Sequence, residues 1–299
     1  MLPDADELAE VLVDLAVPHG DVGELVRMGR RVTDDPELRQ RLEASVGEVV
    51  QGMGEIRNGV DLPELDWASG PLQRCFPVYV FVAALPYTRA YHRERGIPDD
   101  VSRRTLADLG RHVALHRRRY DRAGVLSRRW LTLHFGGELF QLGRLQFQRD
   151  RLGQRTGEAL AAAGVDAGPG TPCLDIHIPD FLGPLSPRAC DRSLALAAEF
   201  FARHFPEEKY GLATCHSWLL DPQLQGYLSA DSNIVRFQER FRVAREDTEP
   251  ADLEPVQFVF GDPGLPVETL PRRTAVERAV GDHLRAGQHW YIGHGWFPL

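Results

Sequence analysis

The spacing at which apolar residues recur along this 299-residue chain changes near residue 129. Up to about residue 125, apolar residues recur three and four positions apart, which is the spacing of one face of a helix. Beyond the change, short apolar runs of strand length alternate with further helical patterns. The sequence therefore predicts an α+β chain, with a helical N-terminal domain over residues 1–127 and a mixed β-sheet flanked by helices over residues 128–299.

The first domain contains several helix signals. Asp4 can cap one helix, and Asp35-Pro36 can begin another. Residues 75–91 are apolar on nearly all sides, which predicts a buried helix despite two internal prolines. Residues 99–122 are expected to form one long helix that is rich in arginine.

The second domain is expected to begin with a β-hairpin over residues 129–148, because two apolar runs flank Gly136-Gly137. A connection rich in glycine and proline leads to the core of the domain, residues 171–299. The elements expected in this core are strand 174–178, helix 188–204, strand 211–220, helix 232–240, strands 242–244 and 256–260, helix 274–286 and strand 289–292.

Composition narrows the classes of function. A formal net charge of -8 argues against nucleic-acid binding, which needs a basic surface. No apolar run is long enough for a membrane span, and the acidic N-terminus does not resemble a secretion signal. The four cysteines are scattered without a C-x-x-C pair, as is typical of reduced thiols. We expect a cytoplasmic protein with no nucleic-acid or membrane partner.

Ionisable side chains are concentrated in two of the predicted strands. One strand contains Asp175 and His177, and the other contains Cys215 and His216. Core strands rarely hold such groups unless their polar atoms have a chemical task. Imidazole titrates near neutral pH, so His216 is the leading candidate for a general base, with His177 as its companion. Asp175 lies on the same face as His177 and can orient it.

Cys215 has two interpretations. Strand alternation places it on the face opposite His216, in apolar surroundings that suppress the thiolate, which indicates an inert buried thiol. The alternative is a covalent acyl-cysteine formed with His177 as the base. Both interpretations stay open at this point.

Several short stretches resemble a bacterial acyltransferase family that joins a helical N-terminal domain to a GNAT-like C-terminal domain. These stretches are L-G-R-L-Q-F at 142–147, H-I-P at 177–179, G-P-L at 183–185, C-H-S-W-L-L-D-P at 215–222 and S-N-I at 232–234. The resemblance implies direct transfer of an acyl group to an amine. The donor would be acyl-CoA or the phosphopantetheinyl thioester of a carrier protein, bound as a co-substrate with no permanent cofactor.

The resemblance also implies binding residues. In GNAT proteins the pantetheine arm lies between two splayed parallel strands, and the pyrophosphate is bound where a loop enters the next helix. Residues at the matching positions are Gly183, Leu185 and Ser186 for the pyrophosphate, Asn233 and Arg236 for the pantetheine or substrate, and Ser217 and Trp218 for the substrate.

The sequence departs from the GNAT pattern at two points. The loop has one glycine where the usual motif has more, and Arg240 stands where a general-acid tyrosine is common. These departures keep two alternatives open, a Cys215-dependent acyltransferase or hydrolase and a non-catalytic binding module on a degenerate GNAT scaffold.

The expected partner is a small-molecule amine. The arginine-rich stretch over residues 99–122 keeps an acidic acyl-carrier protein open as a second partner. The histidines near the C-terminus do not follow a zinc spacing, so no metal site is expected.

Overall fold

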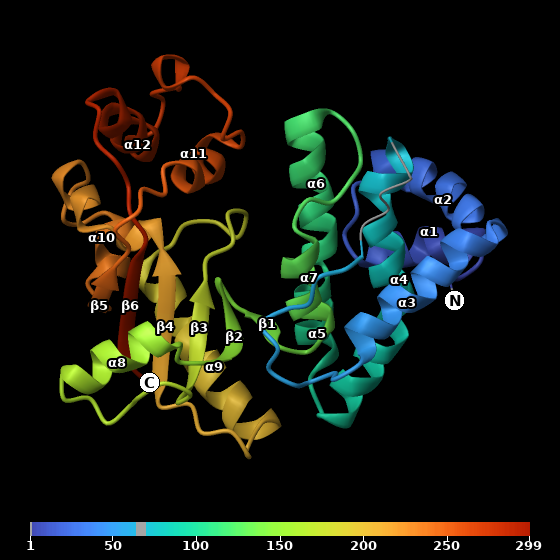
Figure 1. Cartoon of the computed structure of the whole chain (residues 1–299), viewed down its shortest axis with the longest axis horizontal. Coiled ribbons are helices and arrows are strands. Elements are labelled where there is room, and N and C mark those ends of the chain that lie inside the picture. Colours follow the sequence, from blue (N-terminus) through green and yellow to red (C-terminus); the bar gives the residue numbers. More distant parts are fainter. Residues whose placement is uncertain (1, 64–69) are drawn as a thin grey trace. The chain divides into compact units, whose positions relative to one another are not determined.

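A computed structural model describes residues 2–63 and 70–299 of the chain (Figure 1). It divides into two compact units, Met1–Gln141 and Leu142–Leu299. The division falls later in the chain than the domain boundary expected at residues 127 and 128. The reason is that residues 128–135 form a helix of the first unit.

The first unit contains seven helices among its described residues and one buried core. The carboxylates of Asp4 and Asp35 cap the first and third helices as expected, each accepting two backbone N–H bonds. The helices are α1 Ala5–Asp14, α2 His19–Asp34, α3 Pro36–Val50, α4 Pro71–Glu94, α5 Asp99–Leu106, α6 Asp108–Tyr120 and α7 Arg128–Phe135.

Helix α4 is the buried central helix that the sequence predicts. Its side chains are buried on all sides from Cys75 to Leu85, and the hydroxyl of Tyr79 donates to the carbonyl oxygen of Leu25 at 2.7 Å. The hydroxyl of Thr88, on the same helix, donates to the carbonyl oxygen of Phe135 at 2.7 Å. These bonds tie α4 to α2 and α7, so α4 organises the core of the unit.

Two expectations for the first unit are wrong. Residues 130–135 are not a strand but lie in α7, where Phe135 packs on Phe81 of α4 with ring centroids 4.8 Å apart. A short apolar run does not distinguish a buried helix from a buried strand, and packing decides here. The expected single helix over residues 99–122 is interrupted at Ala107, giving α5 and α6.

The start of α6 is fixed by a buried carboxylate. Asp108 is 2% exposed and accepts hydrogen bonds from Arg111 Nε at 2.8 Å and Trp130 Nε1 at 3.2 Å. His134 Nε2 of α7 lies 3.2 Å from the same carboxylate. Burial alone would raise the pKa of Asp108, but His134, His112 and Arg111 outweigh it and hold that pKa well below its usual range. Asp108 therefore joins α6 to α7 as an ionised group.

The described residues form one six-stranded sheet with the strand order β1-β2-β3-β4-β6-β5, and its strands β2 to β6 lie wholly in the second unit (Figure 1). Strands β3 and β4 are parallel and are connected by α9, whereas β6 lies antiparallel between β4 and β5. The strands are β1 Leu139–Leu142, β2 Leu145–Arg151, β3 Pro172–His177, β4 Leu212–Ser217, β5 Arg242–Glu246 and β6 Gly293–Pro298. The helices are α8 Gln154–Ala162, α9 Pro187–His204, α10 Asn233–Gln238, α11 Leu253–Phe260 and α12 Ala275–Arg285, with short 3-10 turns at Trp218–Leu220, Pro222–Gly226 and Val267–Thr269.

The second domain differs from expectation at four places. The strand expected over residues 211–220 ends at Ser217, and Trp218–Leu220 form a 3-10 turn. The hairpin turns at Gly143 and Arg144, not at Gly136-Gly137, so it comprises only β1 and β2. Residues 256–260 are not a strand but belong to α11. The last strand begins at Gly293, after the segment 289–292, because the backbone N–H groups of Trp290 and Tyr291 donate to the side chains of Asp252 and Asp221 and not to a strand.

The remaining expected elements of the sheet domain are confirmed in type. Helix α9 begins at Pro187 with Ser186 as its cap, and α12 begins with a capping box formed by Thr274 and Glu277. Across residues 2–63 and 70–299, no helix is both long enough and apolar enough to cross a bilayer.

We expect Asp108→Asn to lower the free energy of unfolding by about 3 kcal/mol, because it leaves a buried set of donors without their charged partner. Chemical denaturation measures this loss. Asp100→Asn is the control, since Asp100 forms an exposed ion pair with Arg104 and its loss costs about 0–1 kcal/mol.

The contribution of Asp108 to the free energy of unfolding also depends on pH. Its folded-state pKa is lowered, so the stabilisation is present above the ordinary carboxyl pKa of about 4 and is lost as the pH falls toward the folded-state value. The difference in stability between wild type and Asp108→Asn should therefore shrink below about pH 4. An unchanged difference at pH 3 and pH 7 would contradict the ionised state.

Candidate active site

The parallel strands β3 and β4 separate part of the way along their length. Their paired residues are Leu174 with Ala213 and Asp175 with Thr214, and the pairing ends there. Each strand nevertheless stays paired with its outer neighbour, β3 with β2 as far as His177 and β4 with β6 as far as Ser217. The opening is therefore a splay between two well-held strands and not the fraying of a strand end.

Polar side chains line one face of the sheet at this splay. The Thr214 hydroxyl donates to Asp175 Oδ1 at 2.9 Å across the last rung. One strand period further on, His177 follows Asp175 and His216 follows Thr214, so the two imidazoles lie on the same face of the diverging strands. The structure thus brings together three of the four catalytic residues predicted from the sequence.

The two histidines have different surroundings. His177 Nε2 lies 2.9 Å from Gln148 Oε1 of β2 and 3.5 Å from Asp175 Oδ2, and the side chain is 23% exposed. His216 is exposed to solvent, and its ring packs against that of His294 on β6. His177 is therefore oriented by polar partners, whereas His216 is the more accessible base.

Cys215 lies on the opposite face of β4, as strand alternation predicts. Its side chain is 1% exposed, and burial raises the pKa of the thiol well above its usual value. A buried, protonated thiol that points away from both histidines is a poor nucleophile. This geometry disfavours the covalent alternative.

The loop between β3 and α9 ends at a capped helix start. The Ser186 hydroxyl accepts a bond from the Ala189 N–H at 3.3 Å, and Pro187 occupies the first turn. Gly183 has a positive φ of 75°, and a Cβ built there would meet nothing within 4 Å, so the space above it is open. Leu185 anchors the loop with a buried side chain.

Two arginines that the sequence did not predict as binding residues contact this loop or the helix start that follows it. Arg144, in the hairpin turn, donates from Nε to the carbonyl oxygen of Gly183 at 2.9 Å, and its Nη1 is buried without a hydrogen-bond partner. Arg240, after α10, donates to the carbonyl oxygen of Pro187 at 3.2 Å and pairs with Asp191 at 2.7 Å. Both guanidinium groups act on the buried Cys190 of α9, opposing the rise in its pKa that burial causes. Two guanidinium groups therefore lie at the junction of loop and helix, and one of them is paired with Asp191.

Of the other predicted binding residues, Trp218 is buried and the remaining three are at least partly exposed. Asn233 is exposed at the start of α10, where Ser232 provides the cap, and Arg236 pairs with Glu239 at 3.1 Å. Trp218 is buried and packs on Phe258, so it stabilises the core, whereas Ser217 keeps partial exposure.

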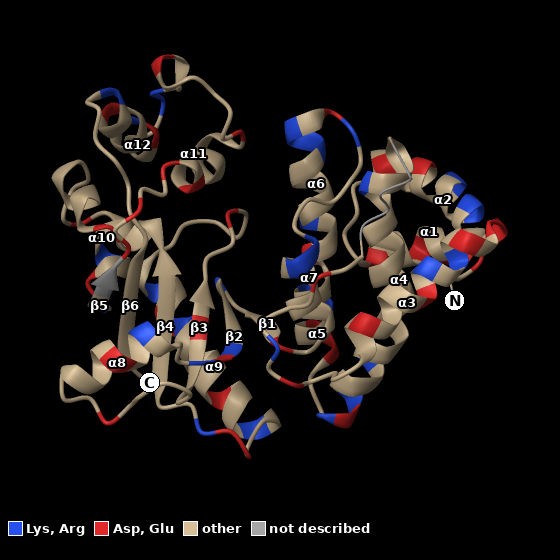
Figure 2. Ribbon diagram, viewed as in Figure 1, with Lys and Arg blue, Asp and Glu red and all other residues tan. Residues whose placement is uncertain are grey.

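Figure 2 shows arginine positions in blue along α6, and ion pairs neutralise part of the charge of this arginine-rich stretch. Arg104, Arg111 and Arg117 pair with Asp100, Asp108 and Asp21. These ion pairs weaken the case for docking an acidic carrier protein.

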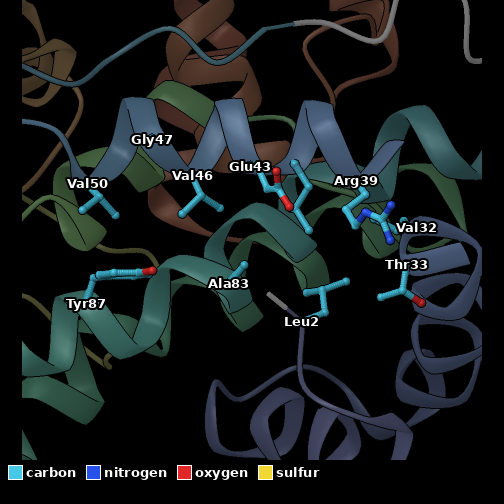
Figure 3. A pocket seen from close by; sticks show the side chains of 11 residues that line it. Leu2, Val32, Thr33, Arg39, Glu43, Val46, Gly47, Val50, Ala83 and Tyr87 are labelled. Carbon is cyan, nitrogen blue, oxygen red and sulfur yellow. The ribbon is translucent and has the colours of Figure 1, made fainter. Parts of the chain in front are cut away.

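An apolar cavity of about 400 Å³ lies within the helical unit, between α2, α3 and α4 (Figure 3). Val46 and Val50 of α3 face Ala83 and Tyr87 of α4 across it, and none of the predicted site residues lines it.

Within the described part of the chain, no group of three or more His, Cys, Asp or Glu side chains is arranged to hold a metal ion.

A splayed pair of parallel strands that leads into a capped helix start is the arrangement expected of a GNAT fold, and it makes this splay the candidate active site. Family models agree: residues 6–137 match the N-acyltransferase N-terminal domain, and residues 139–297 match the GNAT-like C-terminal domain. The chain belongs to this family of N-acyltransferases and is an enzyme.

Solved structures are similar over the whole chain. One is an acyltransferase in complex with decanoyl-CoA and teicoplanin, and another is a mutant acyltransferase in complex with octanoyl-CoA. Each is 39% identical, with a TM-score of 0.90, and the match covers 100% of this chain and 90% of the other. No curated protein matches the sequence.

We expect Cys215→Ser to retain most of the acyl-transfer activity, with stability lowered by about 1–3 kcal/mol because a hydroxyl replaces a thiol on a buried face. Intact-protein mass spectrometry after incubation with the acyl donor alone should show no adduct. An acyl adduct at Cys215, together with an inactive serine variant, would establish the covalent route instead.

Proposed function

We propose that this enzyme transfers an acyl group from acyl-CoA to an amine by direct attack, with the reaction taking place at the splay of β3 and β4. The single observation that supports this most is the end of strand pairing at Asp175 and Thr214, followed by one imidazole on each diverging strand. Beyond that rung, the facing backbone edges of β3 and β4 are not paired with each other. They offer hydrogen-bonding groups to the amides of a pantetheine arm, in the manner of an added strand.

The charges of the donor fit the loop that follows β3. The pyrophosphate of CoA carries negative charge, which the start of α9 and the guanidinium groups of Arg144 and Arg240 can stabilise. We propose that these arginines compensate for the glycines that the loop lacks. Gly183, Leu185 and Ser186 shape the loop, while Asn233 and Arg236 are placed for contacts further along the donor or substrate.

The reaction needs one base and no covalent relay. His216 takes a proton from the ammonium group of the acceptor, and the free amine attacks the thioester carbonyl carbon. The C–N bond forms and the C–S bond breaks. Of the two protons that the ammonium group loses on becoming an amide, one passes from His216 to the CoA thiolate and the other is released to solvent. His177, oriented by Asp175 and Gln148, lies on the other strand, where it can donate to the developing oxyanion or the leaving sulfur.

The similar structures suggest substrates. Those proteins were captured with decanoyl-CoA, octanoyl-CoA and teicoplanin, so we propose an acyl chain of medium length and an amine on a comparably large acceptor. All four thiols are free and buried, as suits a reducing cytoplasm where acyl-CoA is made. A carrier-protein thioester is the alternative donor, and binding without catalysis is the alternative function.

The experiment measures transfer from octanoyl-CoA and decanoyl-CoA to a panel of amines that includes teicoplanin, with holo-carrier protein loaded with the same acyl groups as a second donor. Product amide should appear with acyl-CoA. Donor binding, seen as a higher melting temperature but without turnover on any amine, would favour the binding-module alternative.

We expect His216→Ala to lower kcat by about 10²-fold or more while leaving the melting temperature nearly unchanged, because an exposed base is lost without disturbing the core. His177→Ala should also lower kcat or narrow the pH profile. His289→Ala is the control, since His289 is an exposed histidine paired with Asp252 away from the splay. Full activity of both site variants would refute the base assignment.

We expect Arg144→Ala and Arg240→Ala each to raise the KM for acyl-CoA by about tenfold or more, since each removes a charge-assisted hydrogen bond. With an acyl-pantetheine donor, which has no pyrophosphate, the same variants should match wild type. Arg203→Ala, at the exposed far end of α9, is the control. An equal loss with both donors would place the arginines elsewhere than at the pyrophosphate.

A further inference from the structure

We propose that His294 and Asp247 form a positioning pair that holds the ring of His216 in its catalytic orientation; this inference rests on the proposed function of His216. His294 lies directly opposite His216 in the antiparallel pairing of β4 and β6. The two ring centroids are 4.5 Å apart, with an angle of 58° between the planes. His294 Nε2 in turn lies 3.1 Å from Asp247 Oδ1.

The need for positioning follows from the exposure of His216. An exposed side chain on a strand can adopt several rotamers, and a base that is misplaced by about 1 Å can lose about 10²-fold in rate. His294 is 6% exposed and its backbone is fixed within the sheet, so its ring presents a stationary surface. Contact with that surface restricts the rotamers open to His216.

A bulge in β5 brings Asp247 to the correct face. The register with β6 shifts between Val243, paired with Gly295, and Arg245, paired with His294. In an unbroken ladder Ala244 would pair with His294, and Asp247 would then lie on the other face of the sheet. The extra residue reverses that parity, so Asp247 can pair with His294. Bulges that redirect a side chain beside an active site are a recurrent device.

Two acidic groups lie near this end of the sheet. Burial and the nearby Asp247 raise the pKa of Glu254 of α11, whereas Asp247 Oδ1 is the carboxylate oxygen that lies 3.1 Å from His294 Nε2. Asp175 and Thr214 bond to each other on the far side of His216. The order across the sheet is therefore Asp247, His294, His216 and then the open splay.

The test compares His294→Ala, which removes the ring, with His294→Phe, which keeps a ring of similar shape and removes the nitrogens. For positioning, we expect the alanine variant to lower kcat about tenfold or more while both KM values stay within about twofold. The phenylalanine variant should recover to within about threefold of wild type. Asp247→Asn should cause a smaller loss, and His289→Ala should cause none.

The outcomes separate the possible roles. If His294→Phe is as inactive as His294→Ala while folded, the ring surface does not hold His216 in place, and positioning by the ring is refuted. Wild-type kcat in His294→Ala would refute any role. Should the alanine variant fail to fold, the phenylalanine and Asp247→Asn variants decide in the same way. Full activity of His216→Ala would instead refute the proposed base, a failure that is visible before His294 is changed.

Discussion

The hydrogen bond between the Thr214 hydroxyl and Asp175 marks the last rung that β3 and β4 share, and the arrangement of the site depends on it. Both residues are buried, so the bond is shielded from water and joins the strands firmly at the base of the splay. Beyond it, β2 and β6 each hold one strand in place. The gap between the strands is therefore bounded by rigid elements, which is the condition for holding reacting groups in a fixed geometry.

Asp175 contacts both a residue of the other strand and one of the two histidines at the splay. One carboxylate oxygen accepts the Thr214 hydroxyl, and the other lies 3.5 Å from His177 Nε2. Any shift of the last rung therefore also shifts the partner of His177. On the second strand the equivalent support comes from β6 through His294, so the two imidazoles are held by different means: a buried carboxylate for one, a neighbouring ring for the other.

Sequence reasoning identifies what lies close along the chain or repeats with a simple period. Alternation is enough to place Asp175 and His177 on one face and to separate Cys215 from His216, and the capping signals at Asp4 and Asp35 locate the starts of α1 and α3. It could not assign Trp130–Phe135 to a helix, because a short apolar run fits both types until its neighbours are known. It also missed Asp247 and Arg144. Their roles depend on a bulge and on a hairpin turn that meets α9, which are long-range features with no local signal.

Strand parity also decides which mechanism is open to the enzyme. Cys215 and His216 are adjacent in sequence, yet the pleat directs one into the apolar interior and the other toward the splay. A nucleophilic thiol would need a base on its own face, and burial raises its pKa, so thiolate is not available for attack. The thioester is already an activated acyl group, and positioning its carbonyl carbon beside an amine and a base is sufficient. A one-step transfer with His216 as the proposed base therefore needs nothing that the fold does not provide.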